Sequence, residues 1–209
     1  LGDVTQTAGK FKSGGYQDAR VQLSLLATLF GIIAEYDADV RWKEVAAGMR
    51  ESLGRAGKNS KAGSDSTYQE ARARSEELSD LVRGSAGNAG SPQTREDWST
   101  VADRRPLMTR MEIGQRGRLT PWTANEQEFE RNAPELLREA ELLTALSRVI
   151  QAEGYEYGDD TTYQEYARGL EAALKALTES LRASDFARAQ EAAGAANRSC
   201  DQCHADFRG

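Results

Sequence analysis

The stretch Leu23–Ile33, which reads LSLLATLFGII, decides the fold class of this 209-residue chain. Its large apolar residues recur at spacings of three and four, which places them on one face of an α-helix; they are Leu23, Leu26, Leu29, Phe30 and Ile33. The apolar run Leu23–Ala34 is much shorter than a bilayer crossing, which requires roughly 20 residues. The stretch therefore predicts a helix that packs in a protein core, within a helical segment that begins near Tyr16.

The helical period recurs along the rest of the chain. It predicts helices over about 40–56, 68–83, 124–153 and 163–182, and a last helix from Ser184 or Asp185 to near the end of the chain. Three capping boxes mark helix starts; they are Thr67 with Glu70, Thr123 with Glu126 and Thr162 with Glu165. No segment alternates with the period of a β-strand. We therefore expect an all-α protein, an antiparallel helical bundle of about six helices.

Composition divides the chain into four parts. We expect residues 1–15 to be a polar, loosely held lead-in, 16–83 a first helical unit, 84–123 a long irregular crossover and 124–209 a second helical unit. The crossover holds Pro92, Pro106 and Pro121, and Trp98 and Trp122 would strap it across the bundle.

A faint internal repeat bears on this organisation. Leu25-Leu26-x-x-Leu29 matches Leu142-Leu143-x-x-Leu146, and each motif is followed by a turn and two more predicted helices. The pattern is consistent with two degenerate three-helix units, of which only the second carries the cysteines.

The net charge of the chain restricts the classes of molecule that it is expected to bind. The chain has 27 basic and 33 acidic residues, a net charge of −6, and its pI is about 5.1. A nucleic-acid-binding protein would show a basic stripe, so we expect no nucleic-acid partner. An acidic surface suits docking onto a basic protein partner, and it also favours solubility.

The two cysteines and the only histidine fall within Cys200-Asp201-Gln202-Cys203-His204. A structural zinc site needs four ligands, and Cys and His supply three here, so a carboxylate or a partner chain would have to complete it. A thioredoxin-like redox pair belongs at a helix start within a βαβ unit. A disulfide across this short loop would stabilise almost nothing through chain entropy. Covalent haem of the c type is the fourth interpretation and the one we favour.

Helix geometry suits a haem at this motif. Cys200 and Cys203 are three residues apart and His204 follows Cys200 by four, so all three side chains project from one side of a helix. Two thioethers would hold the porphyrin edge while the imidazole binds the iron. The second imidazole nitrogen should donate to a carbonyl or carboxylate that fixes the ring.

The segment Cys200–Arg208 resembles the C-terminal signature of class II c-type cytochromes, the cytochrome c prime family. The resemblance implies an antiparallel four-helix bundle with the haem motif on its last helix. It implies that Cys200 and Cys203 attach one haem c and that His204 is the proximal iron ligand. Phe207 and Arg208 stand where that family has an aromatic and a basic residue, which implies that they lie near the haem. The crossover 84–123 has no counterpart in the family, and the chain is longer than one such bundle.

The sixth iron ligand has few candidates. The chain has no second His, and low-spin members of the family take a Met from their first helix. The corresponding helices here, 17–35 and 124–153, contain none. Met49 lies on an apolar helix face, whereas Met108 and Met111 lie in the crossover and could reach the iron.

The choice of sixth ligand determines which other side chains we expect to lie around the haem. If Met108 or Met111 binds the iron, the neighbouring arginines would lie near the haem propionates; they are Arg104, Arg105 and Arg110. Otherwise the iron is five-coordinate, with Leu26, Leu143 or Tyr16 as distal cover.

These observations favour a protein that is not an enzyme, because the only imidazole is assigned to iron and a catalytic triad is not available. We expect an exported, periplasmic or secreted, monohaem c-type cytochrome that exchanges single electrons with a redox partner or within a larger complex. A binder or sensor of NO or CO with an open iron position is a second hypothesis. An accessory subunit that serves assembly is a third.

Overall fold

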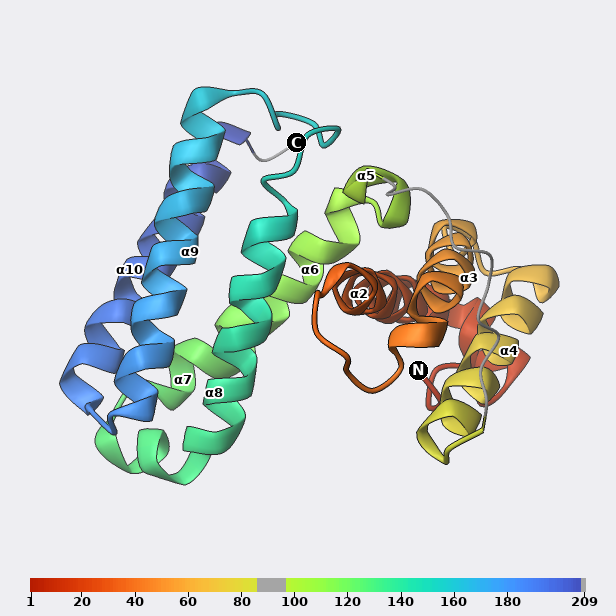
Figure 1. Ribbon diagram of the computed structural model, residues 1–209, viewed down its shortest axis with the longest axis horizontal. Coiled ribbons are helices and arrows are strands. Elements are labelled where there is room, and N and C mark those ends of the chain that lie inside the picture. Colours follow the sequence, from red (N-terminus) through yellow and green to blue (C-terminus); the bar gives the residue numbers. More distant parts are fainter. Residues whose placement is uncertain (86–96, 208–209) are drawn as a thin grey trace. The chain divides into compact units, whose positions relative to one another are not determined.

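The computed structural model describes residues 1–85 and 97–207, and all regular structure in these ranges is helical (Figure 1). The prediction of an all-α protein is confirmed. The chain forms two compact units, Leu1–Leu107 (unit 1) and Met108–Gly209 (unit 2). Shorter helices accompany the longer ones among the described residues, so the expected number of about six helices is not confirmed.

Unit 1 is built on α2 (Tyr16–Glu35), α3 (Ala46–Asn59) and α4 (Asp65–Val82). Leu23, Ala27 and Phe30 of α2 are buried in its core with Met49 and Leu53 of α3, as their helical spacing predicts. The start of α2 at Tyr16 agrees with the sequence. The start of α3 falls later than the predicted residue 40, because Trp42 has a left-handed φ of 70° that a continuous α-helix cannot accommodate.

The N-terminal residues are not the loosely held lead-in that their polar composition predicts. They form α1 (Ala8–Lys10) and a π-helical turn (Phe11–Gly15) that continues into α2. Phe11 is fully buried, and its ring centroid lies 5.7 Å from that of Tyr68 on α4. A single aromatic residue is enough to fix this segment to the core, because burying a phenyl ring stabilises by roughly 1.5–3 kcal/mol.

The short helix α5 (Trp98–Val101) packs on unit 1 through two glycines. A Cβ at Gly31 of α2 would lie 2.8 Å from Cζ3 of Trp98, and a Cβ at Gly54 of α3 would lie 2.6 Å from the Val101 carbonyl oxygen. Both positions therefore exclude any larger residue. Trp98 thus fastens its segment to unit 1, while Pro92 lies outside the described residues.

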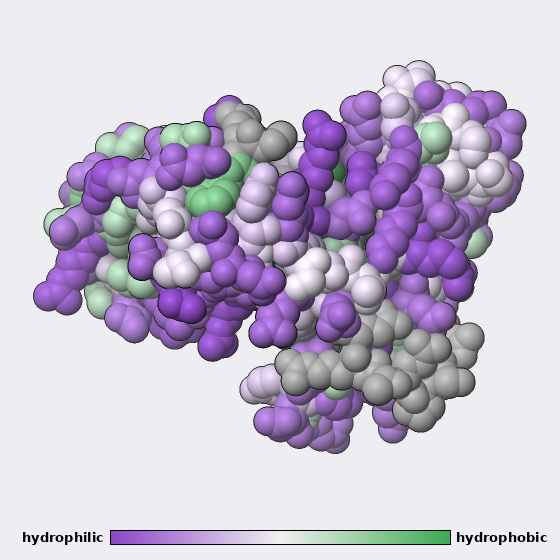
Figure 2. All heavy atoms as spheres, turned by 90° about the horizontal axis from the view of Figure 1, so that it is seen from above, coloured by the Kyte–Doolittle hydropathy of each residue, from purple (hydrophilic) through white to green (hydrophobic). Residues whose placement is uncertain are grey.

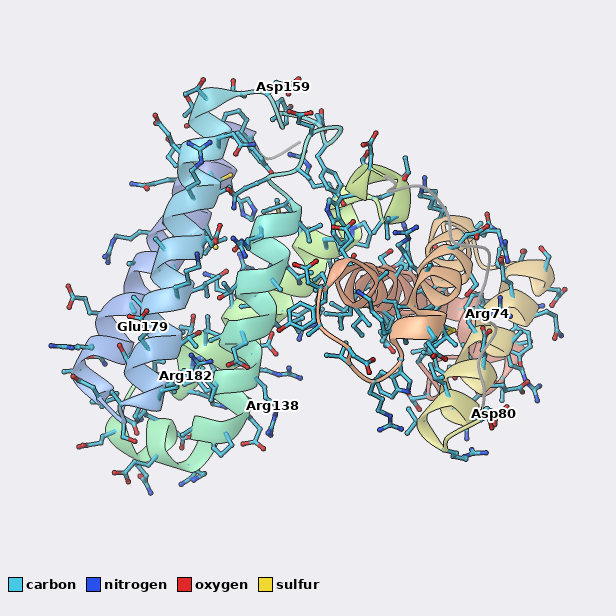
Figure 3. All side chains as sticks on the ribbon, in the orientation of Figure 1. Arg74, Asp80, Arg138, Asp159, Glu179 and Arg182 are labelled. Carbon is cyan, nitrogen blue, oxygen red and sulfur yellow. The ribbon has the colours of Figure 1, made fainter. Side chains whose placement is uncertain are left out.

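Unit 2 consists of four helical stretches. The first is an arm made of α6 (Arg104–Gly114), a π-helical turn (Gln115–Leu119) and α7 (Thr120–Trp122). The others are α8 (Glu126–Val149), α9 (Thr161–Arg182) and α10 (Phe186–Phe207). Figure 1 shows α8, α9 and α10 side by side, and α9 packs extensively on both neighbours. Arg182, labelled in Figure 3, donates a 2.7 Å hydrogen bond to Glu141 and joins α9 to α8.

The arm corrects the prediction of an irregular crossover over 84–123, because residues 98–101 and 104–122 are helical. Pro106 lies in the first turn of α6 and Pro121 at the beginning of α7. Proline is tolerated there because the backbone N–H groups of a first turn have no intrahelical acceptor.

The helix caps also differ from those predicted. Ser64, Asn125 and Asp160 are the N-caps of α4, α8 and α9, and each side chain accepts the backbone N–H three residues later. Thr67 belongs to a capping box, but as its third helical residue, where its hydroxyl accepts the Ser64 N–H. Each helix therefore begins two or three residues away from the predicted cap.

The face of the molecule in Figure 2 is mainly hydrophilic. None of the helices among the described residues is both long and apolar enough to cross a bilayer. The apolar residues of the long helices are instead used in the two cores.

Candidate functional site: an apolar pocket on the last helix

Unit 2 contains a small pocket with a cavity volume of about 40 Å³. The arm, α9 and α10 each present one stripe to it, with residues three and four apart, as expected for one helix face. The α9 stripe is Tyr163, Tyr166, Ala167 and Leu170, and Ile150 adds to it from the end of α8. Most of the lining is therefore aliphatic, aromatic or sulfur-bearing.

The last helix supplies the motif that the sequence singled out. Cys200, Cys203 and His204 all line the pocket, together with Ser199. The three side chains project from one side of α10 into one space, in keeping with their spacing. The His204 imidazole makes no hydrogen bond within residues 1–85 and 97–207, so the partner expected for its second nitrogen is not found among them.

The arm supplies Met108 and Met111 to the same pocket. Met111 is 7% exposed and Met108 is partly buried. Both methionines that the sequence offers as iron ligands therefore line the same pocket as the Cys-x-x-Cys-His motif. It also corrects one premise, because the first helix of this unit is α6 rather than a segment beginning at residue 124, and that first helix does contain Met.

The two thiols are not joined to each other. Burial, with smaller contributions from Asp201 and Cys203, raises the pKa of the Cys200 thiol to about 11. The thiol is therefore protonated at neutral pH, unlike the thiolate that a redox-exchange cysteine needs. Within the described residues, no group of three or more His, Cys, Asp or Glu side chains is arranged to hold a metal ion, which a structural zinc site would require.

An aromatic cluster lies next to the motif. The Phe207 ring packs against Tyr157, Tyr163 and Tyr166, with centroid distances of 5.1, 5.6 and 6.3 Å. Phe207 itself does not line the pocket, but two of its partners do. The Tyr163 hydroxyl donates to the Ile150 carbonyl at 3.1 Å, and the Tyr166 hydroxyl donates to Asp206 at 2.8 Å, which raises the Tyr166 pKa.

Several predicted site residues lie elsewhere. Arg208 is outside the described residues. Leu143 is buried in the α8 core, whereas Leu26 and Tyr16 pack against the core of unit 1, and none of the three lines the pocket. The apolar stripes of α2 and α8 are used for core packing, so they provide no distal cover here.

Sequence reasoning missed the ion-pair cluster that fixes the arm, formed by Glu139 of α8 with Arg110 and Arg118. Arg110 donates to both Glu139 oxygens, at 2.6 and 2.8 Å, and Arg118 donates to one of them. Arg110 is thus committed to Glu139, contrary to the propionate role expected for it. Burial opposes ionisation of Glu139, which is 3% exposed, but the two guanidinium groups outweigh it and hold the Glu139 pKa below its ordinary value.

The donor set of the pocket fits a covalent haem c. Two thiols can form thioethers, and an imidazole and a thioether sulfur can bind iron. The cavity of about 40 Å³ is smaller than a porphyrin, so the pocket walls would have to move apart to admit the group. No known protein-family model matches this chain, and neither the curated proteins nor the solved structures contain a match.

Proposed function

We propose that this chain is an exported monohaem c-type cytochrome, periplasmic or secreted, that transfers single electrons. One observation carries the proposal: the Cys-x-x-Cys-His motif of α10 and the two methionines of α6 line the same apolar pocket. Thioether, imidazole and sulfur donors in one pocket are the ligand chemistry of a six-coordinate haem c. The resemblance to class II c-type cytochromes supports the same interpretation.

Each residue of the motif has a defined role. The Cys200 and Cys203 sulfurs would hold the porphyrin to α10 through thioether bonds, and a neutral nitrogen of His204 would bind the iron. When bound, haem c supplies an iron centre that gains and loses one electron. Because the ligands are held on a long helix, their positions change little when the charge at the iron changes.

Met108 or Met111 of the arm would supply a sulfur ligand to the iron. In low-spin members of the similar family the Met comes from the first helix of the bundle, and α6 is the first helix of unit 2. A sulfur ligand there occupies the position at which CO or NO would bind. The placement of Met108 and Met111 therefore favours electron transfer over gas binding.

One side of the pocket is buried and fixed. Ile150, Ala167 and Leu170 are buried, and Tyr163 is anchored by its hydrogen bond to the Ile150 carbonyl. Apolar side chains on this side would lower the local dielectric around the ligands and strengthen electrostatic interactions there. The acidic chain suits a redox partner with a basic face.

The first test is an optical spectrum of the dithionite-reduced holoprotein before and after addition of CO. We expect a sharp low-spin spectrum that does not respond to CO. The Met108→Leu and Met111→Leu substitutions, singly and together, identify the ligand: the double variant and one of the single variants should become high-spin and bind CO. Met49→Leu, in the core of unit 1, is the matched control and should leave the spectrum unchanged.

The outcomes separate the hypotheses. A wild-type spectrum without haem bands, or haem that remains covalently bound in the Cys200→Ser, Cys203→Ser double variant, would reject a c-type cytochrome. A broad high-spin wild-type spectrum that shifts with CO would reject Met ligation and support gas binding instead.

A further inference from the structure

Arg50, on α3 of unit 1, is a buried cation that forms no ion pair within residues 1–85 and 97–207. The residue is 4% exposed, and its Nε is buried without a hydrogen-bond acceptor. No carboxylate or carbonyl among residues 1–85 and 97–207 pairs with its guanidinium. Buried charges are normally paired, because an unpaired one loses its hydration without compensation. A ligand that enters beside Arg50 would supply the counter-charge that the described residues do not provide.

Arg50 lines a groove of about 900 Å³, including its open mouth, between α3 and the segment that begins at Asp97. The aliphatic part of the side chain is fixed by α2, since a Cβ at Gly31 would lie 3.3 Å from Arg50 Cδ. Gly54, one turn further along α3, allows the Val101 carbonyl to approach the helix. The groove therefore lies beside a positioned guanidinium rather than a mobile surface arginine.

Two other cationic side chains of α3 line the groove, and they differ in whether a carboxylate neutralises their charge. Arg55 pairs with Glu70 at 3.2 Å. Lys58 donates to the Thr100 carbonyl, which is neutral, and forms no ion pair within the described part of the chain. Arg50 and Lys58 are eight residues, roughly two helical turns, apart on α3, and both line the groove.

We propose that this groove binds the phosphate group of a small phosphorylated molecule that also carries hydroxyl groups. A guanidinium forms paired hydrogen bonds with a phosphate, and an ammonium adds a second charge suited to a dianion. Glu51 and Asp97 also line the groove and would accept hydrogen bonds from the hydroxyl groups. The site lies entirely in unit 1 and does not depend on the haem proposal.

The proposal is tested by titrating the purified holoprotein with inorganic phosphate and with glycerol 3-phosphate in a calorimeter. We expect saturable binding that weakens at least tenfold in Arg50→Met. Arg72→Met is the matched control, because Arg72 is exposed on α4 and pairs with Glu76 at 2.9 Å. Tighter binding of glycerol 3-phosphate identifies a phosphate ester as the ligand, and equal binding identifies free phosphate; both support the site.

A second measurement covers the case in which Arg50 is needed for folding. In phosphate-free buffer, Arg50→Met should unfold at the same temperature as the parent or higher, because the substitution removes an unpaired buried charge. A clear fall in that temperature would show that Arg50 has a partner within the chain and would overturn the proposal. So would an absence of binding by both probes, or binding that Arg50→Met leaves unchanged.

Discussion

Glu139 lies on the apolar stripe of α8, between Leu136 and Leu143, and it holds the arm that carries Met108 and Met111. Arg110 and Arg118 reach it from the arm. Gly114 is part of the same contact, since a Cβ at that position would collide with the Glu139 carboxylate. One buried carboxylate therefore sets how closely the arm approaches α8.

Replacing Glu139 by Gln should lower the free energy of unfolding of unit 2 by about 3–5 kcal/mol, because two arginines lose their counter-charge and one of them is buried. Glu135→Gln on the same helix is the control. Glu135 is exposed, and its pair with Arg138 should be worth at most about 1 kcal/mol. Chemical denaturation monitored through the haem band measures both variants. Equal stability of the two would show that the ion pairs do not hold the arm.

The same carboxylate predicts a pH dependence. The Glu139 pKa is lower in the folded protein than its ordinary value of 4.5, so the folded state binds fewer protons than the unfolded state as pH falls toward that value. Its contribution to stability is fully present above pH 4.5 and is lost as pH falls through the lower folded pKa. Thermal unfolding of unit 2 measured from pH 7 to pH 3 should therefore show a steeper decline in the parent than in Glu139→Gln. Parallel declines would contradict this assignment.

At the scale of the helices, the caps can be tested directly. Asp160→Ala should lower the free energy of unfolding of unit 2 by about 1 kcal/mol, because the Tyr163 backbone N–H loses its acceptor. Thr162→Ala, at the cap that the sequence pattern indicates, should change it by less than about 0.5 kcal/mol. Denaturation curves of the two variants decide between the caps. A larger loss for Thr162→Ala would show that α9 begins where the pattern placed it.

The helices could be predicted from the sequence wherever apolar spacing was regular, as in α2, α9 and α10. The arm could not, because its prolines and arginines resemble those of a loop, although both prolines stand in first turns where they are harmless. A signal for the ion-pair cluster did exist. Glu139 falls at helical spacing among Leu136, Ala140 and Leu143, and a carboxylate on an apolar stripe requires a cation from elsewhere in the chain.

Local sequence alone brings together only the Cys-x-x-Cys-His part of the site. Cys200, Cys203 and His204 are close in sequence, so helix geometry alone places them together. Met108 and Met111 are distant in sequence, and their approach to α10 depends on packing that no local pattern encodes. The unpaired charge of Arg50 is visible only once burial is known.

For the whole molecule, the two units have separate cores, and a core substitution should destabilise its own unit. Leu53→Ala in unit 1 and Leu174→Ala in unit 2 each leave a cavity at a buried position. Each substitution should lower the free energy of unfolding of its unit by about 2–5 kcal/mol. The midpoint of haem-band loss during denaturation should fall for Leu174→Ala and remain unchanged for Leu53→Ala. A shared fall would mean that the two cores unfold together.

The position of the arm at the beginning of unit 2 has a consequence for biosynthesis. A growing chain emerges from its N-terminus, so α6 with its methionines exists long before the residues of α10 are added. Almost the whole of unit 2 must be synthesised before the walls of the pocket can meet, whereas unit 1 can condense early. Contacts between such distant segments form slowly. The two thiols should therefore remain accessible to solvent during an interval that ends only when the last helix docks.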